Sequence, residues 1–183
     1  SPAYVMHTSG STGAAKGVVV SQGALLRYVE NARVIYGLAP GTTVWNHSAM
    51  AQDFTVTTFI APLLAGATVS CVPRGDLAAV LDACETGDVL KLTPSHLRII
   101  DELVPGDALP EGFPSRIIMG GEILLAAHVR RLRRWQPSGR IFNEYGPTEA
   151  CVGCSVHECD DGNGTGSLPI GSALPSARLY VLD

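Results

Sequence analysis

Short runs of β-branched and other apolar residues alternate along the chain with longer stretches in which apolar residues recur every three or four positions. The short runs predict strands at residues 3–7, 17–21, 67–72, 88–93, 115–120 and 140–145. The longer stretches predict helices around residues 25–36, 77–84 and 97–103. Alternation of this kind predicts an α/β fold, with largely parallel sheets flanked by helices.

The boundaries of these elements carry their own signals. Ser21, Asp76 and Ser95 stand just before the helical stretches, and we expect each to cap a helix N-terminus. Near the end, the polar and glycine-rich segment 160–169 separates two alternating segments, which we expect to form an antiparallel or edge element at residues 151–158 and 177–183. The chain contains no internal repeat and no low-complexity linker.

Composition narrows the class of protein. The 183 residues are 46% hydrophobic, which is enough material for one domain core. A net charge of −4 gives no attraction for nucleic acid or an anionic membrane, so neither is expected as a partner. The basic run at 130–134 keeps a helical period and is interpreted as a solvated helix face. Pro62 and Gly66 interrupt the most apolar stretch, which is too short to span a membrane. The odd number of cysteines, five, is typical of reduced intracellular thiols. We therefore expect a soluble cytoplasmic protein.

Residues 7–17, HTSGSTGAAKG, contain no apolar side chain larger than alanine. They follow a predicted strand, and glycine-rich turns at the carboxyl ends of strands let backbone N–H groups approach phosphate oxygens. The hydroxyls, the glycines and Lys16 together predict a phosphate-binding loop. The pattern differs from a Walker loop, because Lys16 lies between Ala15 and Gly17. On this stretch alone, a plain flexible turn is the alternative.

Three separated motifs point to one family. YVMHTSGSTGAAKG at 4–17, NEYGPTE at 143–149 and GSLPIG at 166–171 closely resemble, in order and spacing, the adenylate-forming superfamily, and within it the adenylation domains of nonribosomal peptide synthetases. His7 and Ala15 depart from the tyrosine and proline usual in that family. The resemblance implies that residues 1–183 are a partial AMP-binding core from the large N-terminal region. This core would run from the phosphate-binding loop to just before the ribose-binding region, with the small C-terminal domain absent.

The resemblance implies an activity and its partners. ATP with Mg2+ would activate an amino acid as an acyl adenylate, which would pass to the phosphopantetheine thiol of a peptidyl carrier domain beside neighbouring synthetase domains. Such a reaction depends on positioning and charge neutralisation, and needs no protein nucleophile. By position, the residues that would hold the nucleotide are Thr8, Ser9, Gly10, Ser11, Thr12, Gly13, Lys16, Gly120, Gly121, Asn143, Tyr145, Gly146 and Thr148. The resemblance assigns Tyr145 to the adenine and Mg2+ to Glu149, with Lys16, Thr148 and Glu149 as the catalytic residues.

The same resemblance places Asp53 where these domains hold the α-ammonium group of an amino acid. The alternative is that Asp53 only caps a helix beginning at Phe54. Alignment is weakest at residues 47–52, because Gln52 replaces the usual aromatic residue. The other substrate-pocket positions implied are Phe54, Thr57, Lys91, Ile118, Gly120, Glu144, Val152 and Gly153.

Lys91 and Glu144 suggest which amino acid is bound. A lysine inside a sheet that is covered on both faces needs a partner, and Glu144 can be that partner. Lysine only donates hydrogen bonds and an ionised carboxylate only accepts them, so a side-chain carboxamide fits between the two. This favours asparagine, since aspartate would be repelled by Glu144 and glutamine needs more room. We expect Asp53, Lys91 and Glu144 to line one cavity, with Glu149 and the loop at its mouth.

Three other interpretations compete. Cys151, Cys154, His157 and Cys159 have the look of a zinc site, but they fall within one predicted extended segment that could not easily surround an ion. Acyl-CoA synthetases and luciferase-like enzymes share the phosphate loop, yet their acids have no ammonium group for Asp53 to pair. The chain could also be an inactive structural or binding fragment, and we expect it to show little activity in isolation.

Overall fold

The computed structural model describes residues 1–9, 15–104 and 112–182. Its main sheet has seven strands in the order β4-β3-β5-β6-β7-β8-β9. The bounds of these strands are Thr43–Asn46 (β3), Thr68–Cys71 (β4), Val89–Leu92 (β5), Arg116–Gly120 (β6), Arg140–Tyr145 (β7), Ser155–Cys159 (β8) and Ser172–Ala173 (β9). Strands β4 to β7 pair in parallel, whereas β8 and β9 add antiparallel pairings at one edge. The predicted α/β class with a largely parallel sheet is confirmed.

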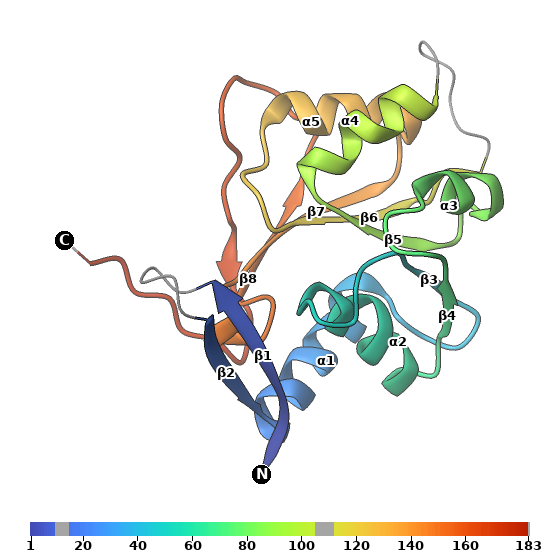
Figure 1. Cartoon of the computed structure of the whole chain (residues 1–183). Helices are drawn as coiled ribbons and strands as arrows, with labels where there is room; N and C mark the ends of the chain where they lie inside the picture. The colour runs from blue at the N-terminus through green and yellow to red at the C-terminus, as the bar shows by residue number, and fades with distance from the viewer. Residues whose placement is uncertain (10–14, 105–111, 183) are drawn as a thin grey trace.

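Helices cover both faces of this sheet (Figure 1). The bounds are Gln22–Tyr36 (α1), Ala61–Leu64 (α2), Leu77–Ala83 (α3), Pro94–Leu103 (α4) and Ala126–Trp135 (α5). Two apolar cores result, because successive strand residues point to opposite faces. Leu90 packs with α3, α4 and α5, while Val89 and Ile118 pack with α1 and α2. A polar side chain on either face of the central strands is therefore removed from water.

The first two strands form a separate unit. β1 (Pro2–Ser9) and β2 (Ala15–Ser21) pair antiparallel with each other and do not join the main sheet. In Figure 1 this hairpin stands beside α1. Segment 7–17 follows a strand, as predicted, but this strand belongs to an antiparallel hairpin and not to the parallel sheet. An apolar run predicts a strand but does not say which strand it pairs with.

Helix caps were predicted correctly at two of three places. Ser21 and Asp76 accept hydrogen bonds from the backbone N–H groups of Ala24 and Ala79. The third prediction, Ser95, is wrong, because α4 already begins at Pro94. Thr93 is the N-cap residue there, and Pro94 occupies the first turn, where its missing N–H costs nothing.

The C-terminal part differs from the prediction in extent. Ser155–Cys159 forms a strand antiparallel to β7, as expected for part of segment 151–158. Residues 177–182 form no strand, and the short β9 pairs with β8 instead. Strand β3 was not predicted. In the described part of the chain, no helix combines the length and apolar character needed to cross a membrane.

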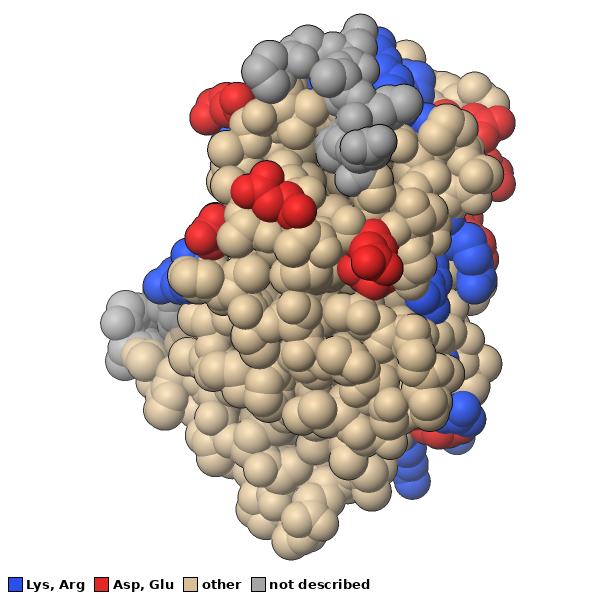
Figure 2. Space-filling view, turned by 90° about the vertical axis from the view of Figure 1, so that its right-hand side faces the viewer, with Lys and Arg blue, Asp and Glu red and all other residues tan. Residues whose placement is uncertain are grey.

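The charged side chains are unevenly spread on the face drawn in Figure 2. Uncharged residues cover the lower half of this face, and the Lys and Arg side chains lie mainly toward its edges. The arginines of α5 are engaged with the chain itself: Arg130 donates to the carbonyl oxygens of Gly162 and Gly164, and Arg133 to those of Cys159 and Asp160. This basic run holds neighbouring segments in place and is more than the solvated face expected from its period.

Candidate active site

A pocket of about 590 Å³ lies at the carboxyl ends of the parallel strands. Its walls come from β1 and from the segments that follow β3, β4, β5, β6 and β7, and they include His47, Arg74, Ser95, Glu122 and Thr148. Open α/β sheets bind ligands at this end, where the connecting segments diverge. The pocket is therefore the candidate active site.

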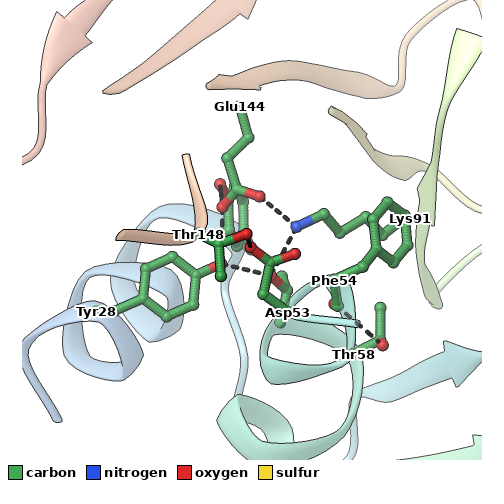
Figure 3. A network of polar contacts seen from close by, with 9 residues as sticks. Tyr28, Asp53, Phe54, Thr58, Lys91, Glu144 and Thr148 are labelled. Atoms are coloured by element: carbon green, nitrogen blue, oxygen red, sulfur yellow. Dashed lines mark hydrogen bonds and ion pairs between the residues drawn. The ribbon is translucent and has the colours of Figure 1, made fainter. Parts of the chain in front are cut away.

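Asp53 projects into this pocket from the segment that precedes a helix. The helical residues begin at Phe54 and include a π-helical turn, Val56–Ile60. The hydroxyl of Thr148 donates a 2.7 Å hydrogen bond to the Asp53 carboxylate, which joins positions 95 residues apart (Figure 3). Asp53 stands where a helix cap would, but this hydrogen bond directs its carboxylate to the segment after β7. The geometry thus offers a half-buried negative charge to the pocket.

Behind Phe54 lies a buried ion pair. Lys91 on β5 and Glu144 on β7 have side chains that are 2% and 3% exposed, and the Lys91 ammonium donates to Glu144 Oε2. Strand β6 separates the two, and it carries Gly120 beside them. A Cβ atom at Gly120 would lie 3.7 Å from Lys91 Cε and 3.1 Å from the Glu144 carbonyl oxygen. Glycine at this position therefore relieves a tight contact with the β7 backbone, and the Lys91 side chain lies against it at ordinary contact distance.

Hydroxyl groups complete the surroundings of this pair. Lys91 Nζ donates a 2.7 Å hydrogen bond to Thr57 Oγ1, and it lies 4.6 Å from the centre of the Phe54 ring. Tyr28 and Tyr36, both on α1, each donate to Glu144 Oε1 at 2.7 Å. A buried charge is tolerated only when it is paired and hydrogen-bonded. Figure 3 shows Tyr28, Phe54, Lys91 and Glu144 converging from α1, the helix after Asp53, β5 and β7.

Burial, reinforced by the negative charge of Glu144, raises the pKa of Tyr28 and Tyr36 well above the ordinary value for tyrosine. Both phenols are consequently protonated at neutral pH. They act as hydrogen-bond donors toward the carboxylate.

The predicted substrate residues fall into two layers. Asp53 and Phe54 line the pocket, as do Gly121 and Thr148 from the predicted nucleotide set. The buried layer behind them consists of Thr57, Lys91, Ile118, Glu144 and Val152. The expectation that Asp53, Lys91 and Glu144 line one cavity is therefore not met. The two charged residues bind each other, and the Phe54 ring lies against Lys91 on the pocket side.

The segment after Thr148 is strained and tightly packed. Cys151 and Val152 have φ values of 60° and 71°, a region that side chains other than glycine rarely occupy. This conformation brings Gly153 against Glu144, where a Cβ atom would lie only 2.7 Å from Oε1. A Cβ atom at Gly146 would lie 2.1 Å from the Val152 carbonyl oxygen. Both glycines are needed for the backbone to close on the Glu144 carboxylate.

The remaining predicted nucleotide residues lie in three places. Thr8 and Ser9 are at the end of β1, and Lys16 pairs with Thr8 across the hairpin as an exposed residue of β2. Gly10, Ser11, Thr12 and Gly13 lie outside the described residues. Glu149 is exposed in a short 3-10 helix, Thr148–Ala150, directly after β7.

Two further predicted residues lie on β7 itself. Tyr145, the last residue of the strand, is 47% exposed. Asn143 is buried and donates a 2.8 Å hydrogen bond to the Pro169 carbonyl oxygen, so its amide connects β7 to segment 160–169.

Pattern reasoning missed the histidines of the pocket. His47 follows the unpredicted strand β3, and its ring meets that of His96 edge to face at 5.0 Å. His47 Nε2 hydrogen-bonds the Lys91 carbonyl oxygen at 2.9 Å. Burial lowers the pKa of His47, and burial together with the nearby His47 lowers the pKa of His96 to about 4. Both rings are therefore neutral at pH 7, and recognising β3 would have placed His47 at the carboxyl end of the sheet.

The cysteine-rich segment does not form the cluster that a zinc site needs. Cys151 and Cys154 precede β8, and Cys159 ends it. Among the residues that the structure describes, no three His, Cys, Asp or Glu side chains are grouped so that they could hold a metal ion. All five cysteines have free thiols, and only Cys71 is exposed.

Comparisons with known proteins agree on one family. A family model described as AMP-binding enzyme matches residues 1–183. The chain is 34% identical over 187 residues to bacitracin synthase 3 of Bacillus licheniformis, a match that covers 99% of the chain and 3% of that protein. It is 35% identical over 186 residues to tyrocidine synthase 3 of Brevibacillus parabrevis, again covering 99% of the chain and 3% of that protein. The chain thus spans a small part of these curated relatives.

A solved structure supports the same relationship. The Vibrio cholerae adenylation domain AlmE, determined in complex with glycyl-adenosine-5'-phosphate, superposes with a TM-score of 0.79 at 27% identity. The match covers 94% of this chain and 33% of that chain.

Proposed function

We propose a function for this chain from one premise, that it belongs to the family of AMP-binding enzymes. In our proposal it forms the amino-acid side and part of the nucleotide side of an adenylation site. The site activates L-asparagine with ATP as an aminoacyl adenylate, and the aminoacyl group then passes to the phosphopantetheine thiol of a carrier domain. The observation that carries the choice of substrate is the buried Lys91–Glu144 pair behind Asp53 and Phe54.

Asp53 supports an amino acid over other carboxylic acids. Its carboxylate lines the pocket and accepts a hydrogen bond from the neutral hydroxyl of Thr148. Thr148 carries no charge, so this hydrogen bond does not neutralise the half-buried carboxylate. The α-ammonium group of an amino acid would supply the missing positive charge. A fatty or aryl acid would leave the charge uncompensated, which is costly in a desolvated site.

The donor and acceptor groups of the buried pair support asparagine. The Lys91 ammonium has three N–H groups, of which one points to Glu144 and one to Thr57. The third faces the Phe54 ring, whose centre lies 4.6 Å from Nζ, and in our proposal it donates to a substrate carbonyl oxygen once that ring turns aside. Glu144 Oε2 accepts from Lys91 and keeps one lone pair for an N–H donor. A carboxamide presents one acceptor and one donor group side by side, whereas a carboxylate would present two acceptors to Glu144.

The phosphate side rests on the hairpin and on the segment after β7. Thr8 and Lys16 flank the glycine-rich connection, and Lys16 supplies an exposed positive charge for the β- and γ-phosphates. Thr148 is placed to hold the α-phosphate near Asp53. Glu149 offers an exposed carboxylate oxygen, the ligand type that Mg2+ takes from proteins when phosphates and water fill its other positions. When bound there, Mg2+ would neutralise phosphate charge.

ATP–pyrophosphate exchange in the full-length protein that carries this sequence tests the proposal. Asparagine is expected to give the highest rate among asparagine, aspartate and glutamine, and benzoate and octanoate are expected to give none. Asp53→Asn is expected to raise the KM for asparagine, and its matched control is Asp76→Asn, which keeps an N-cap acceptor at a residue that does not line the pocket. A higher rate with aspartate or an aryl acid would overturn the choice of asparagine.

The isolated 183-residue chain is a useful comparison in the same assay. We expect it to show little exchange, because it matches only a third of the AlmE adenylation chain. Robust exchange by the chain alone would contradict this. The proposal also implies neighbouring synthetase domains and a cytoplasmic location.

A further inference from the structure

Two tyrosines on α1 contact the proposed specificity pair, although neither belongs to the motifs that indicate the family. Tyr28 and Tyr36 lie eight residues apart, so they share one face of the helix with Ala32 between them. Both hydroxyls end on the same atom, Glu144 Oε1, at 2.7 Å. Tyrosines at helical spacing are ordinary core residues, but two phenols on one carboxylate oxygen are a specific arrangement.

The hydrogen bonds around Lys91 form a closed ring in which every donor can be assigned, with two routes running from Lys91 to Glu144. Lys91 can only donate, so Thr57 Oγ1 accepts from it. Glu144 is an acceptor, so the hydroxyl of Tyr28 donates to it. The contact between Thr57 and Tyr28 then has one remaining assignment, in which Thr57 donates to the Tyr28 oxygen. Lys91 closes the ring by donating to Glu144 Oε2.

Tyr36 adds a donor from outside this ring. With both phenols in place, the two lone pairs of Glu144 Oε1 are used, and Oε2 is the oxygen directed to Lys91. The backbone at Gly153 closes the remaining side of Oε1, since no Cβ atom would fit there. The carboxylate therefore cannot rotate without breaking two hydrogen bonds to Oε1.

We propose that Tyr28 and Tyr36 are positioning residues that fix which oxygen of Glu144 faces the substrate, and thereby set the preference for a carboxamide over a carboxylate. This inference rests on the proposed adenylation function and deepens it. With Oε1 occupied, a substrate side chain that displaces the Phe54 ring meets one oxygen, Oε2, which accepts an N–H donor and repels a carboxylate. Without the phenols, the Glu144 carboxylate can turn both oxygens to Lys91 and Thr57. The site then no longer discriminates between the side chains of asparagine and aspartate.

The test compares Tyr28→Phe and Tyr36→Phe with the unchanged full-length protein in ATP–pyrophosphate exchange. These variants remove one hydroxyl each and keep the ring that fills the core. The KM for asparagine is expected to rise about tenfold in each, as for loss of one hydrogen bond to a charged group, with kcat little changed. The ratio of kcat/KM for asparagine to that for aspartate is expected to fall by a similar factor, while the KM for ATP stays the same.

Tyr4→Phe is the matched control, because the Tyr4 hydroxyl is also part-buried but donates to Cys151 Sγ. Its asparagine to aspartate ratio is expected to equal that of the unchanged protein. Equal losses for asparagine and aspartate in Tyr28→Phe and Tyr36→Phe, or a raised KM for ATP, would show a structural role and overturn the positioning role. Unchanged kinetics would overturn it as well.

The proposed function is judged separately, from the unchanged protein alone. If another amino acid is its best substrate, the assignment of asparagine fails before any variant is compared. The same variants are then measured with that amino acid, and a rise in its KM without change in kcat would retain the positioning role of the two tyrosines.

Discussion

Lys91→Met tests whether the buried ion pair behaves as its surroundings require. Methionine has a similar length but no charge, so the substitution leaves the Glu144 carboxylate, 3% exposed, with the two phenols and no cation. Removing one partner of a buried pair typically costs about 3–5 kcal/mol, because the other charge stays desolvated and unpaired. That is a large part of the roughly 5–15 kcal/mol by which domains are stable.

A second substitution separates the cost of a stranded charge from the loss of packing. Glu144→Gln alone strands the Lys91 ammonium and is expected to destabilise to a similar degree. In the double variant Lys91→Met/Glu144→Gln no buried charge remains, and the glutamine carbonyl can still accept from the phenols. The double variant is therefore expected to lose less unfolding free energy than the sum of the two single losses, and the difference should be about 2 kcal/mol or more.

The measurement is equilibrium unfolding in urea, followed by the fluorescence of the two tryptophans, Trp45 on β3 and Trp135 on α5, which are both buried. The matched control is Arg140→Met, which breaks a surface pair with Glu158 whose side chains are about half exposed. Its cost is expected to be below about 1 kcal/mol. The reasoning is refuted if Lys91→Met costs no more than Arg140→Met, or if the two single losses add without coupling.

Three further predictions use other parts of the chain. The pKa of His96 is lowered to about 4, below the value of 6.5 for an unfolded histidine. The contribution of neutral His96 to stability is therefore complete above pH 6.5 and is lost as the pH falls toward 4. The thermal midpoint should fall less over this pH range in His96→Gln than in the unchanged protein. Gly146→Ala should lower the urea midpoint by the equivalent of about 3 kcal/mol, since its Cβ would overlap the Val152 backbone, whereas Gly23→Ala, with open space around it, should not. Mass spectrometry after brief iodoacetamide treatment should find Cys71 labelled first and the four buried cysteines protected; early labelling of a buried one would contradict the packing.

The chain's hydrophobic pattern was enough to predict most strands of the fold. The six predicted strands are present because each is a short apolar run bounded by turn-forming residues. Strand β3 escaped prediction because it contains only two successive apolar residues, Val44 and Trp45, with polar residues on both sides. Which strands pair was not predictable for β1 and β2, since local alternation carries no information on the partner.

The candidate site could be predicted only in part, for a physical reason. The resemblance placed Lys91 and Glu144 in one pocket, and donor and acceptor chemistry made them partners. The ion pair confirms that partnership, but the resemblance did not reveal that Phe54 lies on the pocket side of Lys91. Tyr28 and Tyr36 were not predicted as site residues, because helical spacing indicates which face of a helix packs and not where a hydroxyl group points.

The expected stability of the double variant bears on why the pair exists at all. Buried ion pairs are seldom more stabilising than well-packed neutral groups of the same size, because desolvating two charges offsets most of their attraction. If Lys91→Met/Glu144→Gln folds nearly as well as the unchanged protein, stability alone does not account for a lysine and a glutamate on central strands. Recognition of a polar side chain does account for them, since a site whose buried groups must be satisfied discriminates strongly against ligands that leave them unpaired. The central sheet then supplies what a mobile loop could not, a rigid placement of both charges on strands that flank β6.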